Sequence, residues 1–142
     1  YTESLQVNLI DAKYEKSLFT NVQLESIHHQ LQLLMEVNRL FLIPELSLTI
    51  VAKNLDIHPN TLSLVINKLE QKNFFDYINT LRVEEFKNRV LLSDSHRFTL
   101  LSIAFQCGFN SKTSFNRNFK KIIGQSPSEF LKENQIMLNE KY

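Results

Sequence analysis

Residues 108–124 read GFNSKTSFNRNFKKIIG, a stretch with four basic side chains and no acidic one. Arginine and lysine can donate hydrogen bonds to guanine O6 and N7, and asparagine can pair with adenine, so this inventory suits the reading of base edges. Phe115, Phe119 and Ile122 recur at helical spacing and predict a helix over about residues 111–123. The outward face left over holds four candidate base-reading residues: Lys112, Thr113, Asn116 and Arg117.

Four other polar residues of this stretch suit phosphate better than bases. Ser111 and Ser114 lie near the expected helix start, where backbone N–H groups and the helix dipole attract anions. Lys120 and Lys121 follow further along and would position the helix on phosphate without reading sequence. The plain alternative is a basic helix that is merely solvated, so the rest of the chain must decide.

The chain contains an internal repeat, which is its most specific pattern. In the first half of the repeat, each match lies 52 residues on: Leu48, Val51, Ala52, Leu55 and Ile57 match Leu100, Ile103, Ala104, Cys107 and Phe109. In the second half each match lies 53 residues on: Leu62, Ile66 and Leu69 match Phe115, Phe119 and Ile122. The repeated unit is a helix, a tight turn and a second helix, which is the size of a helix-turn-helix.

Small and turn-forming residues stand at equivalent places in the two copies. Ala52 and Ala104 would let a second helix cross closely. Gly108 follows the first helix of the later copy, where a residue commonly needs positive φ. Asp56 holds that place in the earlier copy and tolerates the same conformation. A generic pair of helices would not need residues of these types at these offsets.

The second helix of the first copy has a milder outward face. Asn60, Thr61, Ser63, Leu64, Asn67 and Lys68 are expected there. Four of them are candidate base-reading residues: Asn60, Ser63, Leu64 and Asn67. Leu64 could only touch a thymine methyl group, and Lys68 is a candidate phosphate contact. Simple solvation explains this face nearly as well as base reading does.

The other elements are expected to be helical too. Helical segments are predicted at 25–42, 47–55, 58–71, 73–92, 99–107, 111–123 and 126–133. Ser47, Thr99 and Ser126 are the expected N-caps of three of them, and Pro44 is expected to stop the first segment. The segment at 73–92 would span roughly 30 Å. Because major-groove faces recur every ~34 Å, such a helix could hold two helix-turn-helix units about one turn of DNA apart.

Composition and charge agree with a helical, anion-binding domain. The 142 residues include 43% hydrophobic residues, two glycines and three prolines, which favours one all-helical domain with a real core. The net charge is only +1, but residues 47–132 carry twelve Lys and Arg against seven acids. Residues 1–46 carry three against six. A basic excess in the middle of the chain is the footprint expected on a polyanion.

Other functional classes find little support in the sequence. No catalytic triad, paired carboxylate or glycine-rich phosphate loop stands out, so we expect neither an enzyme nor a cofactor. The adjacent His28 and His29 point to different helix faces, and no metal site is expected. Cys107 aligns with core Leu55 and is expected to be a packing residue. Arg82 and Arg89 could contact phosphate, but the favoured expectation is that they pair with the carboxylates of neighbouring glutamates: Glu84 and Glu85.

The chain resembles the DNA-binding domain of the AraC/XylS family of bacterial transcription regulators. Three segments carry the resemblance: LTIVAKNLDIHPNTLSLVIN, FFDYINTLRVEEFK and LLSIAFQCGFNSKTSFNRNFKKIIGQSPSEF. The part from Ile103 to Phe130 is the most specific, and the similarity covers about residues 34–132. The family implies seven helices, with two homeodomain-like helix-turn-helix units joined by a rigid helix and bound in adjacent major-groove segments. The family's base-contacting positions fall on Asn60, Ser63, Leu64, Lys112, Thr113, Asn116 and Arg117.

These observations predict an all-α domain that binds double-stranded DNA as the output part of a transcription regulator. The expected organisation is a lead-in over 1–24, the DNA-binding domain over 25–133 and a tail over 134–142. Within the domain, the expected parts are a first unit at about 47–70, a linker helix at about 73–92 and a second unit at about 99–123. The chain starts at Tyr1 rather than Met, and we expect an upstream sensor domain.

The expected partners beside DNA are RNA polymerase and a second copy of the chain, joined through the upstream domain. No small-molecule site is expected in this piece. One cysteine and no long apolar run favour the cytoplasm, where the domain could also form the cytoplasmic end of a membrane-anchored regulator. The open alternative is a helical protein-interaction module that uses the same basic face on an acidic protein partner.

Overall fold

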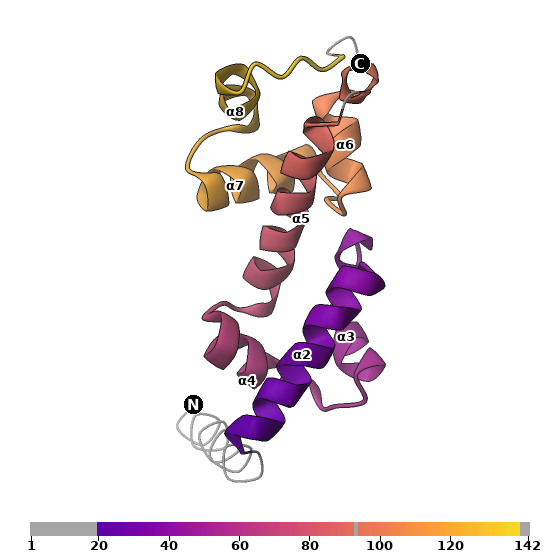
Figure 1. The fold of residues 1–142 in the computed structure, drawn as a ribbon, viewed down its shortest axis with the longest axis vertical. Coiled ribbons are helices and arrows are strands. Elements are labelled where there is room, and N and C mark those ends of the chain that lie inside the picture. Colours follow the sequence, from indigo (N-terminus) through magenta and orange to yellow (C-terminus); the bar gives the residue numbers. More distant parts are fainter. Residues whose placement is uncertain (1–19, 93, 140–142) are drawn as a thin grey trace. The chain divides into compact units, whose positions relative to one another are not determined.

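The computed structural model describes residues 20–92 and 94–139, and the regular structure within them is helical (Figure 1). The elements are α2 (Asn21–Val37), η1 (Leu40–Leu42), α3 (Leu48–Asn54), α4 (Pro59–Glu70), α5 (Phe74–Val90), η2 (Ser95–Arg97), α6 (Leu100–Gln106), α7 (Lys112–Ile123) and α8 (Pro127–Glu133). The predicted all-α class with seven α-helices is confirmed for this part of the chain. The first nineteen residues of the expected lead-in and the last three of the expected tail lie outside the described residues.

The internal repeat is present in the backbone. Helices α3 and α6 both have 7 residues, and α4 and α7 both have 12. The turns are closed by equivalent bonds, because the N–H of Ile57 donates to Ala52 O at 3.0 Å and the N–H of Phe109 donates to Ala104 O at 3.2 Å. Asp56 has φ 55° and Gly108 has φ 104°, so both expected left-handed positions are confirmed.

The three predicted N-caps are confirmed. Ser47 Oγ accepts from the N–H of Ile50 at 3.2 Å, Thr99 Oγ1 from that of Ser102 at 3.0 Å, and Ser126 Oγ from that of Glu129 at 3.1 Å. Each bond satisfies one of the N–H groups that a helix start leaves without an intrahelical partner. The starts of α3, α6 and α8 therefore follow from local chemistry.

Helix α2 differs at both ends from the predicted 25–42 segment. It begins at Asn21 because Thr20 and Gln23 form a capping box, in which the side chain of each accepts from the backbone N–H of the other. It ends at Val37, well before Pro44, because Arg39 takes a left-handed conformation with φ 54°. The segment that follows forms η1 instead of a further helical turn.

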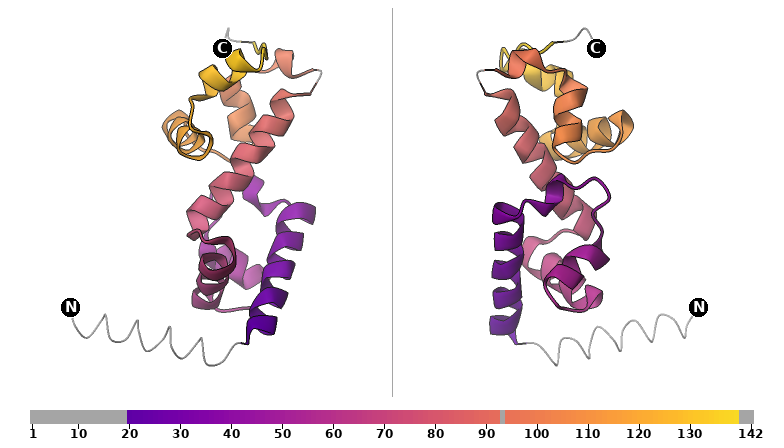
Figure 2. Two further views of the ribbon diagram at one scale, coloured as in Figure 1. Left: turned by 60° about the vertical axis from the view of Figure 1, so that its left-hand side comes forward. Right: turned by 90° about the vertical axis from the view of Figure 1, so that its right-hand side faces the viewer.

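The chain also divides into two compact structural units, each of which contains one of the helix-turn-helix units. The first of these compact units contains α2, α3 and α4. Its interior is built from apolar side chains of these three helices: Leu24, Leu31, Met35, Val51, Ala52, Leu62, Val65 and Ile66. A hydrogen bond of 2.7 Å between His28 Nε2 and Glu70 Oε1 ties α2 to the end of α4. Figure 2 shows α2 lying alongside the α3–α4 pair.

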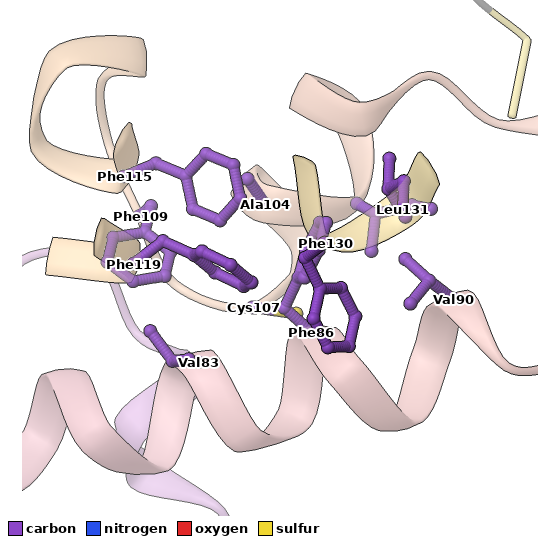
Figure 3. Packing of buried hydrophobic residues seen from close by; sticks show 11 residues of the cluster. Val83, Phe86, Val90, Ala104, Cys107, Phe109, Phe115, Phe119, Phe130 and Leu131 are labelled. Atoms are coloured by element: carbon purple, nitrogen blue, oxygen red, sulfur yellow. The ribbon is translucent and has the colours of Figure 1, made fainter. Parts of the chain in front are cut away.

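The second unit comprises residues 39–46 and 75–142, and its core is aromatic. Helices α6, α7 and α8 gather around the C-terminal half of α5 (Figures 1 and 2). Phe86 of α5 meets Phe115 and Phe119 of α7 with ring centroids 4.8 and 5.6 Å apart (Figure 3). Phe119 in turn meets Phe130 of α8 at 5.5 Å. These contacts hold the inner face of α7 against α5 and α8.

The ends of this unit depart from the sequence pattern in two places. Leu91 was expected to belong to the helix at 73–92, but α5 ends at Val90 and Leu91 is 66% exposed. Beyond α8, Ile136 and Leu138 pack against the core cluster, and the N–H of Asn139 donates to Phe98 O at 2.8 Å. Chain that follows the last helix therefore contributes to the core.

The turn of the second helix-turn-helix packs so closely against neighbouring parts of the chain that no side chain fits at Gly108. A Cβ added there would overlap the carbonyl oxygen of Phe41 and lie 2.7 Å from Nε of Arg82. The left-handed φ of 104° would strain any other residue as well. Both the backbone conformation and the close approach therefore require glycine here.

Gly108→Ala is expected to lower the free energy of unfolding by about 3 kcal/mol or more, since left-handed strain of ~1–2 kcal/mol adds to the overlap. The matched control is Gly124→Ala, because Gly124 has φ 89° but no atom within 4 Å of an added Cβ. That change should cost only the strain of about 1–2 kcal/mol. Urea unfolding of both variants measures the difference, and equal losses would contradict the close approach.

Candidate nucleic-acid interface

Helix α7 is fixed at both ends and along its inner face. Ser111 Oγ accepts from the N–H of Ser114 at 3.1 Å and starts the helix. Gly124 ends it in a left-handed conformation with φ 89°. Phe115 and Phe119 are fully buried beneath it. The side chains on the opposite face are therefore presented in a defined direction.

The outward face of α7 is a continuous row of exposed side chains, which we call the α7 stripe. Its members are Lys112, Thr113, Asn116, Arg117, Lys120 and Lys121. Helical spacing brings residues separated by three or four positions onto one face, so the six side chains lie side by side. The stripe holds four cations, and α7 contains no acidic residue. The structure thus places the four candidate base-reading residues of this unit together with both candidate phosphate-binding lysines.

One lysine of the stripe has an acidic neighbour. Lys121 Nζ donates to Asp76 Oδ1 at 2.9 Å, and the lysine side chain is 63% exposed. An exposed ion pair of this kind is worth at most about 1 kcal/mol, so the lysine can exchange Asp76 for another anion. Lys121 can therefore bind a phosphate group only when its ion pair with Asp76 opens.

The two serines at the start of α7 also have structural partners. Ser111 Oγ caps the helix, and Ser114 Oγ lies 3.4 Å from Nδ2 of Asn118, from which it accepts. Both side chains are half-buried. A hydroxyl group has one donor and two acceptor positions, so accepting one hydrogen bond leaves its own hydrogen able to reach an anion. Their structural role is compatible with phosphate contact.

In the first unit the corresponding surface is the outward side of α4, which we call the α4 face: Asn60, Ser63, Leu64, Asn67 and Lys68. His58 starts the helix, because its Nδ1 accepts from the N–H of Asn60 at 3.1 Å, and Pro59 occupies the first helical position. Asn60, Asn67 and Lys68 are exposed, whereas Ser63 and Leu64 are half-buried. This face is less exposed and less charged than the α7 stripe.

The structure corrects the prediction for Thr61 and shows a partner for Lys68. Thr61, which was expected on the outward face, is only 3% exposed and belongs to the interior. Position 61 lies one residue before core Leu62, and the inner face of α4 is wide enough to include both. Lys68 Nζ donates to Asn21 Oδ1 at 2.8 Å, so this exposed cation is held toward the start of α2.

The prediction for the arginines of α5 is half right. Arg89 Nε pairs with Glu85 Oε1 at 3.0 Å, as expected. Arg82 is buried and uses carbonyl oxygens in place of a carboxylate: Nε donates to Phe41 O at 2.7 Å and Nη2 to Ile43 O at 2.8 Å. These acceptors lie about forty positions earlier in the chain, so sequence proximity to the glutamates was misleading.

Glu85 is the centre of a small charged cluster in the second unit. Arg39 Nη2 lies 2.6 Å from Glu85 Oε2, and Arg89 also reaches Gln106 Oε1 at 3.1 Å. Burial opposes ionisation of Glu85, but the hydrogen bonds and charges of Arg39 and Arg89 outweigh it and hold the pKa of Glu85 below its usual value. The cluster joins the left-handed residue after α2 to α5 and α6.

Side chains that could carry other chemistry have structural roles. Cys107 is fully buried, and burial raises the pKa of its thiol to about 12, so the reactive thiolate is scarce at neutral pH. His28 is bonded to Glu70. Among residues 20–92 and 94–139, no three His, Cys, Asp or Glu side chains gather as metal ligands would. Nor does the described part contain a helix long and apolar enough to cross a membrane.

Comparison with known proteins agrees with this arrangement. Residues 51–133 match the family model described as a helix-turn-helix domain. The chain is 33% identical over 91 residues to the uncharacterized HTH-type transcriptional regulator YijO of Escherichia coli K12, covering 64% of this chain and 31% of that protein. It is 30% identical over 90 residues to the melibiose operon regulatory protein of the same organism, covering 63% and 29%. The chain thus spans about a third of the length of these curated relatives.

A solved structure shows the same fold. The C-terminal domain of AraT, a response regulator from Geobacillus stearothermophilus, superposes with a TM-score of 0.62 at 23% identity, covering 82% of this chain and 89% of that one. The family match covers both the α3–α4 and the α6–α7 units except for the first residues of α3. The chain therefore belongs to the AraC/XylS-type helix-turn-helix family of DNA-binding regulator domains.

Proposed function

We propose that this chain binds double-stranded DNA sequence-specifically, with α7 and α4 each entering a major-groove segment, as the output domain of a transcription regulator. The observation that carries the proposal is the α7 stripe, which combines four cations with an asparagine and a threonine on one exposed face. This combination offers donors for guanine, a pairing group for adenine and charge for phosphate. The repetition of the same scaffold in α3–α4 supports a second contact of the same kind.

We assign the roles by side-chain chemistry and place on the helix. Arg117 and Lys112 suit guanine, Asn116 suits adenine, and Thr113 suits either a base edge or a methyl group. On the α4 face the proposed base-contacting residues are Asn60, Ser63, Leu64 and Asn67. The proposed phosphate contacts are Ser111, Ser114, Lys120, Lys121 and Lys68.

The alternative is a protein-interaction domain that uses the α7 stripe on an acidic partner. It accounts for the cations but gives no reason for the polar α4 face on a duplicated scaffold. RNA polymerase and a second copy of the chain stay predicted partners of the whole regulator, which would act on DNA in the cytoplasm. The domain boundaries at residues 25 and 133 are likewise part of the proposal.

DNA binding is expected to weaken steeply with salt. Each neutralised phosphate contributes a slope of about −0.9, so the three phosphate-binding lysines alone predict a slope of about −3 for log K against log salt. Fluorescence anisotropy between 50 and 200 mM salt measures it, with a duplex selected from a random pool and a scrambled duplex. Polyglutamate of similar charge is the competitor for the acidic-partner alternative. Absence of DNA binding at low salt would remove the proposal.

Arg117→Ala and Lys120→Ala should separate reading from positioning. Both remove one exposed cation of α7. The arginine change should cost ~1–3 kcal/mol on the selected duplex and relax the preference at one base pair, because its contact is to a base. The lysine change should weaken the selected and scrambled duplexes equally. Binding to duplexes with single base-pair changes measures both, and an equal loss of preference in the two variants would contradict the assignment.

Asp76→Asn is expected to strengthen binding to all duplexes by about threefold, because Lys121 can then reach phosphate without giving up an exposed ion pair worth at most ~1 kcal/mol. The change removes the carboxylate that holds Lys121 at 2.9 Å and leaves that ammonium group for phosphate. Asp94→Asn is a suitable control, since it opens the exposed Arg97 ion pair outside α7. Unchanged or weaker binding by Asp76→Asn would show that Lys121 does not reach the DNA.

A further inference from the structure

Three of the buried polar side chains in the second unit form one continuous chain of hydrogen bonds. Asn79, Arg82 and Asn118 are 8, 7 and 8% exposed. Arg82 Nη1 donates to Asn79 Oδ1 at 3.2 Å, and Asn79 Nδ2 donates to Asn118 Oδ1 at 3.3 Å. We call this chain the polar relay. It joins α5 to α7 beside the aromatic core.

One end of the polar relay lies in the first turn of α7. Asn118 Nδ2 donates to Ser114 O at 2.8 Å and lies 3.4 Å from Ser114 Oγ. Ser114 also donates its backbone N–H to the cap residue Ser111. The relay therefore ends at the part of α7 that carries Lys112, Thr113 and Asn116 of the α7 stripe.

The other end is fixed to backbone. Arg82 donates to the carbonyl oxygens of Phe41 and Ile43, and its guanidinium lies over the Phe109 ring at 5.9 Å. Gly108, next to Phe109, is the residue where a Cβ would lie 2.7 Å from Arg82 Nε. The guanidinium is thus held by segment 39–46 and by the turn that leads into α7.

Apolar packing alone defines the rotation of α7 about its axis less sharply than hydrogen bonds do. Contacts between Phe86, Phe115 and Phe119 resist separation of α5 and α7 and favour one rotation, but the energy of each contact changes gradually over small shifts. Hydrogen bonds weaken steeply when their angle changes. Both functional atoms of the Asn118 amide are bonded, one to α5 and one to α7 itself, so rotation of α7 would break a buried hydrogen bond.

Stability alone does not explain the polar relay, because apolar side chains of similar size would often stabilise the fold as well. A buried guanidinium that is paired with carbonyl and amide oxygens keeps a desolvation penalty, and buried ionic groups are often no more stabilising than apolar residues of similar size. No buried side-chain nitrogen or oxygen of the described residues lacks a partner, so the relay is fully satisfied. A fully bonded polar group of this kind can specify one arrangement where apolar packing allows several.

We propose that Asn79, Arg82 and Asn118 are positioning residues for DNA reading, which fix the rotation of α7 so that the α7 stripe faces the base edges in one register. None of the three contacts DNA; they act through Ser114 and the backbone of α7. The inference rests on the proposed DNA-binding function, and it assigns specificity to residues that lie outside the reading face.

The test is the double variant Asn79→Leu/Asn118→Leu, which replaces both amides by apolar side chains of similar size and leaves the two carbonyl bonds of Arg82. The double change removes both partners of the Asn79–Asn118 bond, which by itself can be nearly neutral for stability. Arg82 Nη1 loses its acceptor Asn79 Oδ1, so a loss of stability is expected and is measured by urea unfolding. The measured quantity is the ratio of Kd values for a scrambled duplex and for the duplex selected from a random pool by the unaltered protein. The ratio should fall about tenfold or more, the size of one lost bidentate base contact, while binding to the scrambled duplex stays within about twofold.

Ser95→Ala is the matched structural control. Ser95 is buried in the same unit and its Oγ donates to Val90 O at 2.9 Å, away from α7. This variant should lose stability, as measured by urea unfolding, yet keep the Kd ratio. If the double variant does not fold, Asn118→Asp serves instead: the carboxylate still accepts from Asn79 but no longer donates to Ser114, and the ratio should again fall.

The outcomes separate this inference from the proposed function. If the unaltered protein does not distinguish the two duplexes, the proposed function fails and the inference with it. If the unaltered protein distinguishes them and the relay variants do so equally well, only the positioning role is overturned. An equal fall of the ratio in Ser95→Ala would also overturn it, because loosening anywhere in the unit would then suffice.

Discussion

The second unit depends on the buried guanidinium of Arg82. Its bonds to the carbonyl oxygens of Phe41 and Ile43 hold segment 39–46 against α5, and this segment in turn leaves no room for a side chain at Gly108. The turn at Gly108 sets the angle at which α7 leaves α6. The direction of the α7 stripe is therefore fixed by an arginine that is itself buried and by a glycine that has no side chain.

The starts of α3, α6 and α8 and the repeat could be predicted from the sequence because they follow local rules. Ser47, Thr99 and Ser126 cap helices through N–H groups three residues away, and the 52- and 53-residue offsets of the repeat are reproduced by the helix bounds. The exposed members of the α7 stripe follow from the same 3.6-residue period that buries Phe115 and Phe119. Such features need only neighbours along the chain.

The capping box of Thr20 and Gln23 is a local signal that was missed, whereas the other missed contacts depend on distant partners. Arg82 has glutamates two and three positions ahead, yet its acceptors are carbonyl oxygens 41 and 39 residues away in sequence. Lys121 and Asp76 are 45 positions apart, and Asn79 and Asn118 are 39 apart. A signal for Asn118 was present: it lies three residues after Phe115 and one before Phe119, on the inner face of α7, where a polar residue needs a buried partner.

The two helix-turn-helix units share a backbone but differ in how firmly the reading helix is held. Asp56 holds the position in the first turn that Gly108 holds in the second. Its side chain is exposed, so other parts of the chain pack less closely against the first turn than against Gly108. The α4 face has one cation, Lys68, which is bonded to Asn21, whereas the α7 stripe has four cations on a helix bound by the polar relay. A reading helix discriminates between bases only as sharply as its rotation is fixed, because hydrogen bonds to base edges are directional. If the proposed DNA binding holds, this difference predicts that the second helix-turn-helix unit is the main source of sequence specificity.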